Sequence, residues 1–224
     1  MPQYTQIKAI LIDIGNYVKE HNIRLTFHPG PFNALTSPKS SVIKNTLIDL
    51  ELHANICDLL NLSRSPFNKI NIHCNGVYGD KKSAMDRFCE NFELLSESVQ
   101  KRLTIENDDR PSMYSVKDLM YIHERIGVPI VFDFHHHAIH PDGLSEQEGL
   151  ALAFKTWRVR PCTHYSESKQ VERPKALLRA HSTLVYSEIK DHSMDFDCVI
   201  EAKGKELAII PPRRKFPNSA ELIA

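Results

Sequence analysis

Segments with apolar residues at helical spacing alternate along the chain with short apolar runs. The helical spacing predicts helices over residues 6–20, 37–62, 81–101, 115–125 and 145–156. The short runs are rich in β-branched and aromatic residues and predict strands at 24–28, 69–73, 102–106, 130–134, 157–164 and 197–202. Residues 176–187 have no clear pattern. Because strands that alternate with helices form parallel sheets, the chain is predicted to have an α/β fold.

The predicted strands share a feature at their C-terminal ends, where each carries a histidine or a carboxylate. These residues are His28, His73, Glu106, Asp133, His164 and Glu201. In a TIM barrel all strand ends converge on one face, whereas an open doubly wound sheet gathers side chains only near its switch point. The pattern therefore favours a TIM-barrel-like fold. A closed barrel of this kind has eight strands, and the pattern supplies about six, so an incomplete barrel of about six βα units is expected.

Histidines and carboxylates on one face indicate a metal centre. Their nitrogen and oxygen atoms suit Zn²⁺ or Mn²⁺, and a carboxylate such as Glu106 can bridge two ions. Two ions about 3.5–4 Å apart stabilise both the attacking and the leaving oxygen of a displacement at phosphorus, which makes multinuclear hydrolysis the leading hypothesis. The alternative for each residue alone is a packed or solvent-exposed side chain. This alternative carries most weight for His135, His137 and His140, which follow Asp133.

Composition limits the class of protein further. The 224 residues include 28 Lys and Arg and 28 Asp and Glu, so a polyanion would have to be held by local patches or by bound cations. The five cysteines lack CxxC spacing, which argues against a zinc finger or a disulfide framework and fits a reducing compartment. No apolar run approaches the roughly 20 residues of a membrane span. We expect a soluble intracellular protein with one domain at residues 1–210 and a basic tail at 211–224.

Motifs that occur in order along nearly the whole chain resemble the UV damage endonuclease family. They are HPG (28–30), NIHCNGVYGDK (71–81), LTIENDD (103–109), FDFHHH (132–137), THYSES (163–168), AHS (180–182) and DCVIEAKGKE (197–206). The resemblance implies a TIM barrel related to endonuclease IV. It also implies a cluster of divalent ions and incision of damaged double-stranded DNA 5′ to ultraviolet photoproducts and abasic sites. Two or three ions per chain are expected, commonly Mn²⁺, with Zn²⁺, Mg²⁺ or Co²⁺ as alternatives.

The resemblance also implies roles for individual residues. The expected metal ligands are His28, His73, Glu106, Asp133, His136, His164, His181 and Glu201. One ion would be held by His28, His73 and Glu106, which bridges to a second ion held by Asp133, His164 and Glu201. A third would be held by His136 and His181, although His192 competes with His181 for this assignment. Glu106, Asp133 and Glu201 would be the catalytic carboxylates, and Lys81, Lys203 and Lys205 would contact phosphates unless they are only solvated.

The chain departs from the family at positions that bear on recognition of the lesion. Where the family has Gln and Tyr after HPG, a pair that probes the damaged bases, this chain has Pro31 and Phe32. Phe32 can still stack on bases, but Pro31 has no side-chain amide. Where the family usually has a lysine two residues before a metal histidine, this chain has Cys162, expected to be a softer metal contact or a packed residue.

The family also has two strand-helix units before the HPG strand, and this sequence opens on the helix just before it. An incomplete barrel would expose edges at 24–28 and at the last strand, so a partner chain or a dimer is expected to cover them. Two alternatives to a working endonuclease follow. One is a metal-dependent sugar isomerase or epimerase of the same barrel superfamily. The other is a shortened remnant that binds DNA or metal without catalysis.

Overall fold

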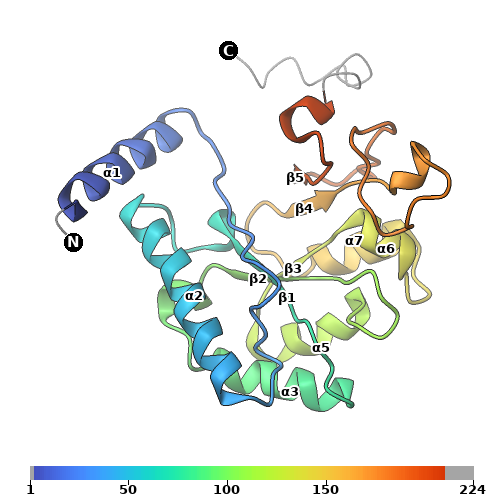
Figure 1. Ribbon diagram of the computed structural model, residues 1–224, viewed down its shortest axis with the longest axis horizontal. Helices are drawn as coiled ribbons and strands as arrows, with labels where there is room; N and C mark the ends of the chain where they lie inside the picture. The colour runs from blue at the N-terminus through green and yellow to red at the C-terminus, as the bar shows by residue number, and fades with distance from the viewer. Residues whose placement is uncertain (1–2, 210–224) are drawn as a thin grey trace.

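Short parallel strands run through the centre of the molecule (Figure 1). In this computed structural model, which describes residues 3–209, one sheet has three strands in chain order: β1 (Ile70–His73), β2 (Leu103–Glu106) and β3 (Ile130–Val131). A second sheet pairs β4 (Cys162–Tyr165) with β5 (Asp197–Ile200). All these strand pairs are parallel. The predicted α/β class with parallel strands is confirmed.

Two isolated parallel bridges join these strands into one series. Phe27 pairs with Ile70 of β1, and Asp133 pairs with His164 of β4. The spatial order is therefore the segment at Phe27, then β1 to β5, which is the order along the chain, as in an α/β barrel. The described residues form no closed barrel. The strand predicted at 24–28 is wrong in extent, since only Phe27 pairs and Pro29 has no N–H to continue a ladder.

The helices lie on the outside of the strands. They are α1 (Tyr4–Glu20), α2 (Ser40–Leu59), α3 (Lys81–Phe92), α4 (Glu97–Gln100), α5 (Val116–Ile126), α6 (Phe134–Ile139) and α7 (Glu146–Phe154), with 3₁₀ turns at Pro66–Asn68, Lys169–Val171 and Lys205–Ile209. The helix predicted at 81–101 is in fact two helices, because the Ser96 side chain caps a new start at α4. The capping boxes of α5 (Ser115 with Asp118) and α7 (Ser145 with Glu148) are both present.

The histidine-rich segment after β3 is helical. Asp133 is the N-cap of α6, and its Oδ1 accepts a hydrogen bond of 2.7 Å from the backbone N–H of His136. The expected strand at 130–134 is therefore shortened to Ile130–Val131, followed by the bridge at Asp133. This N-cap turns the chain so that His136 projects back beside the strand ends while His135 and His137 are buried.

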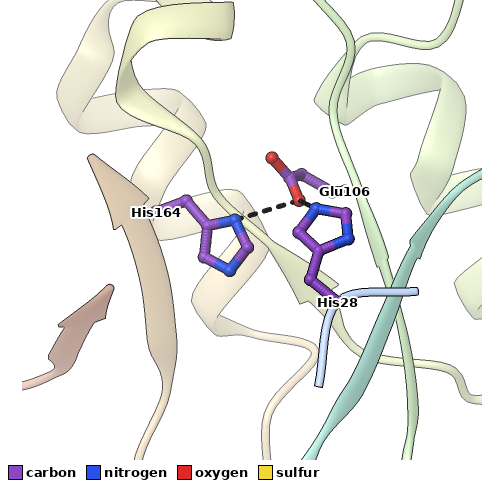
Figure 2. Close-up of side chains that lie close together, drawn as sticks. All are labelled: His28, Glu106 and His164. Atoms are coloured by element: carbon purple, nitrogen blue, oxygen red, sulfur yellow. Dashed lines mark ion pairs between the residues drawn. The ribbon is translucent and has the colours of Figure 1, made fainter. Parts of the chain in front are cut away.

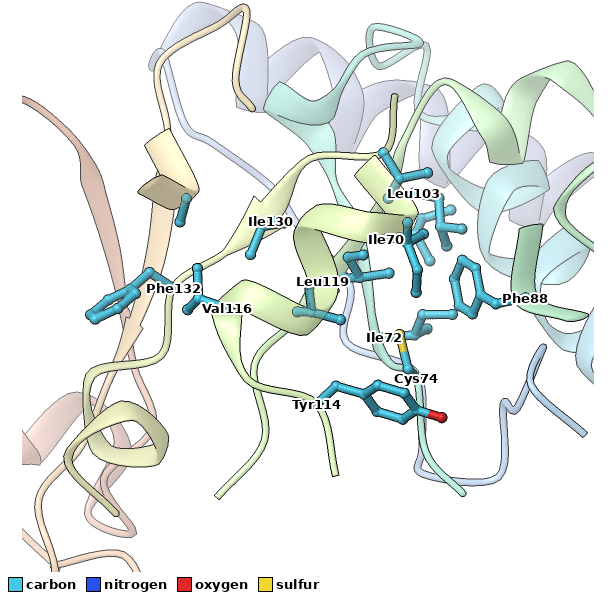
Figure 3. Packing of buried hydrophobic residues seen from close by; sticks show 14 of the residues in the cluster. Ile70, Ile72, Cys74, Phe88, Leu103, Tyr114, Val116, Leu119, Ile130 and Phe132 are labelled. Atoms are coloured by element: carbon cyan, nitrogen blue, oxygen red, sulfur yellow. The ribbon is translucent and has the colours of Figure 1, made fainter. Parts of the chain in front are cut away.

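The apolar core lies between the β1–β3 sheet and helices α3 and α5 (Figure 3). Ile70 and Ile72 of β1 pack there beside Leu103 of β2, and Leu119 of α5 and Phe88 of α3 cover them, all fully buried. Each such side chain contributes about 1.5–3 kcal/mol when removed from water. Since the core fills one side of these strands, the alternate residues of β1 and β2 face the other side, where the polar residues gather.

Helix α1 lies at one edge of the molecule and packs on α2 (Figure 1). The two helices approach closely at Gly15, where a Cβ atom would lie 1.9 Å from the backbone oxygen of Leu60. On the other side of α1, a stripe with alternating spacings of three and four residues is exposed: Ile7, Ile10, Ile14 and Tyr17. This stripe has the spacing of a helix-helix contact. Within residues 3–209, only part of the apolar surface of α1 is therefore buried.

The Arg24 side chain links the segment at 24–28 to β5 through hydrogen bonds. Its guanidinium donates hydrogen bonds to the backbone oxygens of Phe67 (2.7 Å) and Arg160 (2.9 Å) and to Asp197 Oδ2 (2.8 Å) at the start of β5. Side-chain bonding therefore replaces the backbone pairing that the sequence predicts for this segment.

Two sequence predictions concern other properties of the chain. Within residues 3–209, no helix is both long enough and apolar enough to cross a bilayer. The basic tail predicted at 211–224 lies outside the described residues, so the division into a domain at 1–210 and a tail stays a prediction.

Candidate metal centre

Glu106, the last residue of β2, lies among four histidines from four different parts of the chain. Its fully buried carboxylate is 3.3 Å from His28 Nε2 and 3.1 Å from His164 Nδ1, the contacts drawn in Figure 2. It is also 3.4 Å from His136 Nδ1 and 3.9 Å from His73 Nε2. The parallel register that pairs His73 with Glu106 places these two strand ends side by side. The convergence expected from the strand ends is therefore present around one carboxylate.

A second carboxylate group lies on the β4 side. His164 Nδ1 is 2.9 Å from Glu201 Oε1, and a carboxylate oxygen of Asp133 lies within 4.8 Å of the ligand atoms of both residues. Three groups of potential ligand atoms lie within 4.8 Å of one another: His28 with Glu106 and His164, His73 with Glu106 and His136, and Asp133 with His164 and Glu201. The last group matches the expected ligands of one ion. The first two divide the others differently from the expectation, which paired His28 with His73.

His181 is further from the other ligand atoms. Its ring centroid lies 6.3 Å from that of His136 and 5.4 Å from that of His135, and its Nδ1 is 3.1 Å from the backbone oxygen of Glu201. His135, which the sequence suggested to be a mere neighbour, is buried, and its Nε2 makes no hydrogen bond within residues 3–209. His192, the competitor for this position, contacts Glu146 at 2.8 Å instead.

Several polar residues that sequence reasoning did not select support these side chains. Asn71 of β1 donates a hydrogen bond to Glu106, and Nζ of Lys69, the residue before β1, lies 2.7 Å from His164 Nε2. Both are buried, and both alternate with the core residues of the strand, on the same side as His73. The period-two spacing of 69, 71 and 73 is the signal that would have found them.

The loop after β2 supplies a second set of supports. Asn107 Oδ1 accepts a hydrogen bond of 2.8 Å from the backbone N–H of Asp133, and its Nδ2 donates one of 3.1 Å to the Asp133 carbonyl. Asp108 Oδ1 lies 3.2 Å from His73 Nδ1. The run of polar residues directly after Glu106 was visible in the sequence, but its partners are far away along the chain.

The arrangement fits a cation. Glu106 Oε1, Asp133 Oδ2 and His164 Nδ1 are buried and make no hydrogen bond within the described residues, although ligand-type atoms surround them. Close approach without hydrogen-bond geometry is what atoms converging on a shared ion produce, and the set contains only nitrogen and oxygen donors. The residues present can therefore hold divalent ions.

The pKa values describe the same electrostatics. Burial by itself would raise the pKa of Glu106, but the charges of His164 and His73 hold it well below its usual range. Burial raises the pKa of Asp133 to about 7. Burial opposes charge on His73 and His136 too, yet the neighbouring carboxylates raise their pKa values to about 9 and about 10. Protons on these rings thus neutralise the carboxylate charge, which a bound cation could neutralise instead.

The remaining predicted site residues differ in their exposure and contacts. Phe32 is 87% exposed, beside the exposed Pro31, on the loop that follows His28. Lys81 donates a 2.7 Å hydrogen bond to Asp118, whereas the Lys203 side chain is exposed. Cys162 is buried, and burial raises its thiol pKa.

Comparison with known proteins places this geometry in context. The model of the family described as UV-endonuclease UvdE matches residues 2–222. A relative named UV DNA damage endonuclease from Bacillus cereus (strain B4264) is 34% identical over 207 residues, which are 88% of this chain and 63% of that protein. The chain thus spans less than two thirds of the length of that relative.

Solved structures agree with the family match. The crystal structure of SacUVDE superimposes with a TM-score of 0.84 and 32% identity, over 96% of this chain and 74% of that one. D-psicose 3-epimerase from Clostridium cellulolyticum H10 superimposes with a TM-score of 0.59 over 86% of this chain and 69% of that one, but at 14% identity it shows the fold alone. The expected relation to TIM-barrel proteins is confirmed.

Proposed function

Since the chain belongs to the UV-endonuclease UvdE family, we propose that it hydrolyses the backbone of damaged double-stranded DNA on the 5′ side of ultraviolet photoproducts and abasic sites. The observation that carries this proposal is the Glu106 carboxylate, buried among His28, His73, His136 and His164. Such a site can hold cations, and bound cations would attract DNA phosphates although the chain has no net positive charge.

We propose that the centre holds two or three divalent ions, Mn²⁺ first among them. The ligand set contains histidine nitrogens and carboxylate oxygens and no thiolate, which suits Mn²⁺ or Zn²⁺. When bound, the ions supply an activated water and neutralise the charge that develops on phosphate oxygens. Glu106 would bridge two ions, Asp133 and Glu201 would complete the group at His164, and His181 would serve a third ion with His136.

Phe32 is proposed to contact the lesion. It is 87% exposed four residues after His28, and Pro31 beside it restricts the backbone. An exposed aromatic ring can enter a base stack that a lesion has weakened. Of the three lysines proposed for phosphate contacts, Lys203 and Lys205 are exposed, whereas Lys81 is engaged by Asp118.

Incision of defined duplexes tests the proposal. With Mn²⁺ present, the purified chain is expected to cut a duplex that carries one abasic site, or one photoproduct, on the 5′ side of the lesion and to leave the undamaged duplex intact. Retention of the damaged duplex on a gel without cutting, at any Mn²⁺ concentration, would favour the non-catalytic alternative. Conversion of a ketose substrate without DNA incision would favour the sugar epimerase class.

We also propose that a second copy of the chain, or another partner chain, covers the open sides of the sheet. Within residues 3–209, β5 pairs with β4 alone, and the apolar stripe of α1 at Ile7, Ile10, Ile14 and Tyr17 is exposed. Light scattering is expected to give twice the chain mass of 25.7 kDa, and Ile10→Glu is expected to reduce it. A monomer that melts cooperatively at micromolar concentration would contradict this expectation.

A further inference from the structure

The segment at residues 173–179, RPKALLR, combines basic and exposed apolar side chains. It contains three basic residues and no acidic one. Leu177 is 80% exposed and the adjacent Leu178 is 49% exposed, while Lys175 and Arg179 are exposed on either side. Exposed leucines cost free energy in water unless a partner covers them, and flanking positive charge suits a polyanionic partner.

This segment is held beside the candidate metal centre. A turn closes where the backbone N–H of Ala180 donates a 2.9 Å hydrogen bond to the Leu177 carbonyl, and His181 follows directly. Arg179 Nε lies 3.7 Å from Asp109 Oδ2, in the loop that leaves Glu106. A groove of about 350 Å³ runs between Leu177 and Arg110. The segment that carries Leu177 therefore contacts the loop that follows Glu106 and directly precedes His181, and both of these residues are predicted metal ligands.

Leu177 and Phe32 each lie close in the sequence to a histidine of the candidate metal centre. The centroid distances are 5.5 Å from His28 to His73, 5.5 Å from His73 to His136 and 6.3 Å from His136 to His181. Phe32 lies four residues after His28, and Leu177 lies four residues before His181. They have the highest exposed fractions among the large hydrophobic residues of the described chain, 87% and 80%.

We propose that Leu177 is a second wedge into the DNA duplex, in addition to Phe32, with Lys175 and Arg179 on the adjoining phosphates. The proposal rests on the proposed function, because it assumes a damaged duplex as the substrate. Apolar side chains flanked by Arg and Lys are the usual means of unstacking a base step and bending DNA. Two wedges beside the candidate metal centre would hold the lesion more firmly than Phe32 alone.

The test uses the full chain with Mn²⁺ and an abasic duplex whose scissile linkage is a non-hydrolysable methylphosphonate, with 2-aminopurine beside the lesion. Leu177→Ser is expected to weaken binding to this duplex roughly tenfold and to abolish the rise in 2-aminopurine emission that unstacking produces. Binding to undamaged duplex is expected to stay within about twofold, since the phosphate contacts remain. Leu94→Ser, at a leucine that is 61% exposed on another face, is the matched control.

Lys175→Gln tests the contribution of positive charge to DNA binding separately from the contribution of Leu177. It is expected to weaken binding to damaged and undamaged duplexes alike and to reduce the slope of log affinity against log salt by about one. If Leu177→Ser behaves like Leu94→Ser while the wild type binds and unstacks the lesion, the wedge proposal is overturned and the proposed function stands. If the wild type neither prefers nor cuts the damaged duplex, the proposed function itself fails.

Discussion

Replacing Glu106 by Gln is expected to abolish Mn²⁺-dependent incision, with a fall in rate on the order of 10³-fold or more. The carboxylate is shared by two of the three ligand groups, so its loss removes the charge that would bind two ions. Glutamine has the same shape and can still accept the hydrogen bond from Asn71, so the fold should persist. The assay is single-turnover incision of an abasic duplex, with bound Mn²⁺ measured on the same samples.

A matched control comes from helix α5. Glu124 is exposed on that helix, and Glu124→Gln removes the same charge away from the histidines. This control is expected to cut at the wild-type rate and to bind as much Mn²⁺. Incision by Glu106→Gln within tenfold of the control would show that Glu106 is not a bridging ligand.

The same substitution has a readout that does not depend on activity. In the metal-free protein, the charge of Glu106 is one cause of the raised pKa values of His73 and His136. Neutral glutamine removes this contribution while burial still opposes the charge, so both pKa values should fall. Titration of the two imidazole signals by NMR measures the shift, and unchanged pKa values in the variant would contradict the distances found around Glu106.

The sequence predicted those features of the fold that depend on local pattern. The apolar runs at β1 and β2 form strands as predicted, and the Ser115 and Ser145 caps start their helices. The segment at 24–28 failed because its pairing depends on Arg24, whose partners lie up to 173 residues away. The strand prediction at 130–134 failed after Val131 because the Asp133 N-cap starts a helix there, despite the polar composition of three consecutive histidines.

The sequence predicted which residues form the candidate site better than it predicted which of their atoms would share an ion. Residues at strand ends converge because parallel strands end on one face, and this rule found His28, His73, Glu106 and His164. Which atoms share an ion depends on strand tilt and ring rotation, and no sequence pattern encodes these. Lys69 was missed because a lysine at a strand start usually reaches solvent, whereas here it is buried against His164.

The affinity for Mn²⁺ is expected to rise steeply with pH. Without an ion, His73 and His136 have pKa values of about 9 and about 10, so both carry a proton at neutral pH. An ion in the group with Glu106 needs a lone pair from each ring, so two protons must leave. Each released proton gives about a tenfold change in affinity per pH unit, so affinity should increase about 100-fold per unit below pH 9.

The metal-free protein is expected to show the opposite trend. A histidine whose pKa is raised by folding stabilises the fold fully below its unfolded value of about 6.5 and loses this contribution as pH rises through its folded value. The window for His73 and His136 is therefore pH 6.5 to about 9 and about 10. Asp133 adds to this trend at lower pH, because its raised pKa of about 7 makes ionisation destabilising between pH 4 and 7. Melting temperature should fall from pH 7 to 9 in EDTA.

Calorimetric titration with Mn²⁺ at pH 6.5, 7.0 and 7.5, in pairs of buffers with different ionisation enthalpies, counts the protons directly. Two protons per ion in the Glu106 group are expected. Asp108→Asn is the informative variant: it removes the carboxylate 3.2 Å from His73 Nδ1, lowers the pKa of His73 and should leave the proton from His136 as the main one released. Fewer than one proton per ion in the wild type, or an affinity independent of pH, would mean that the ion does not displace protons from these rings and that the centre lies elsewhere.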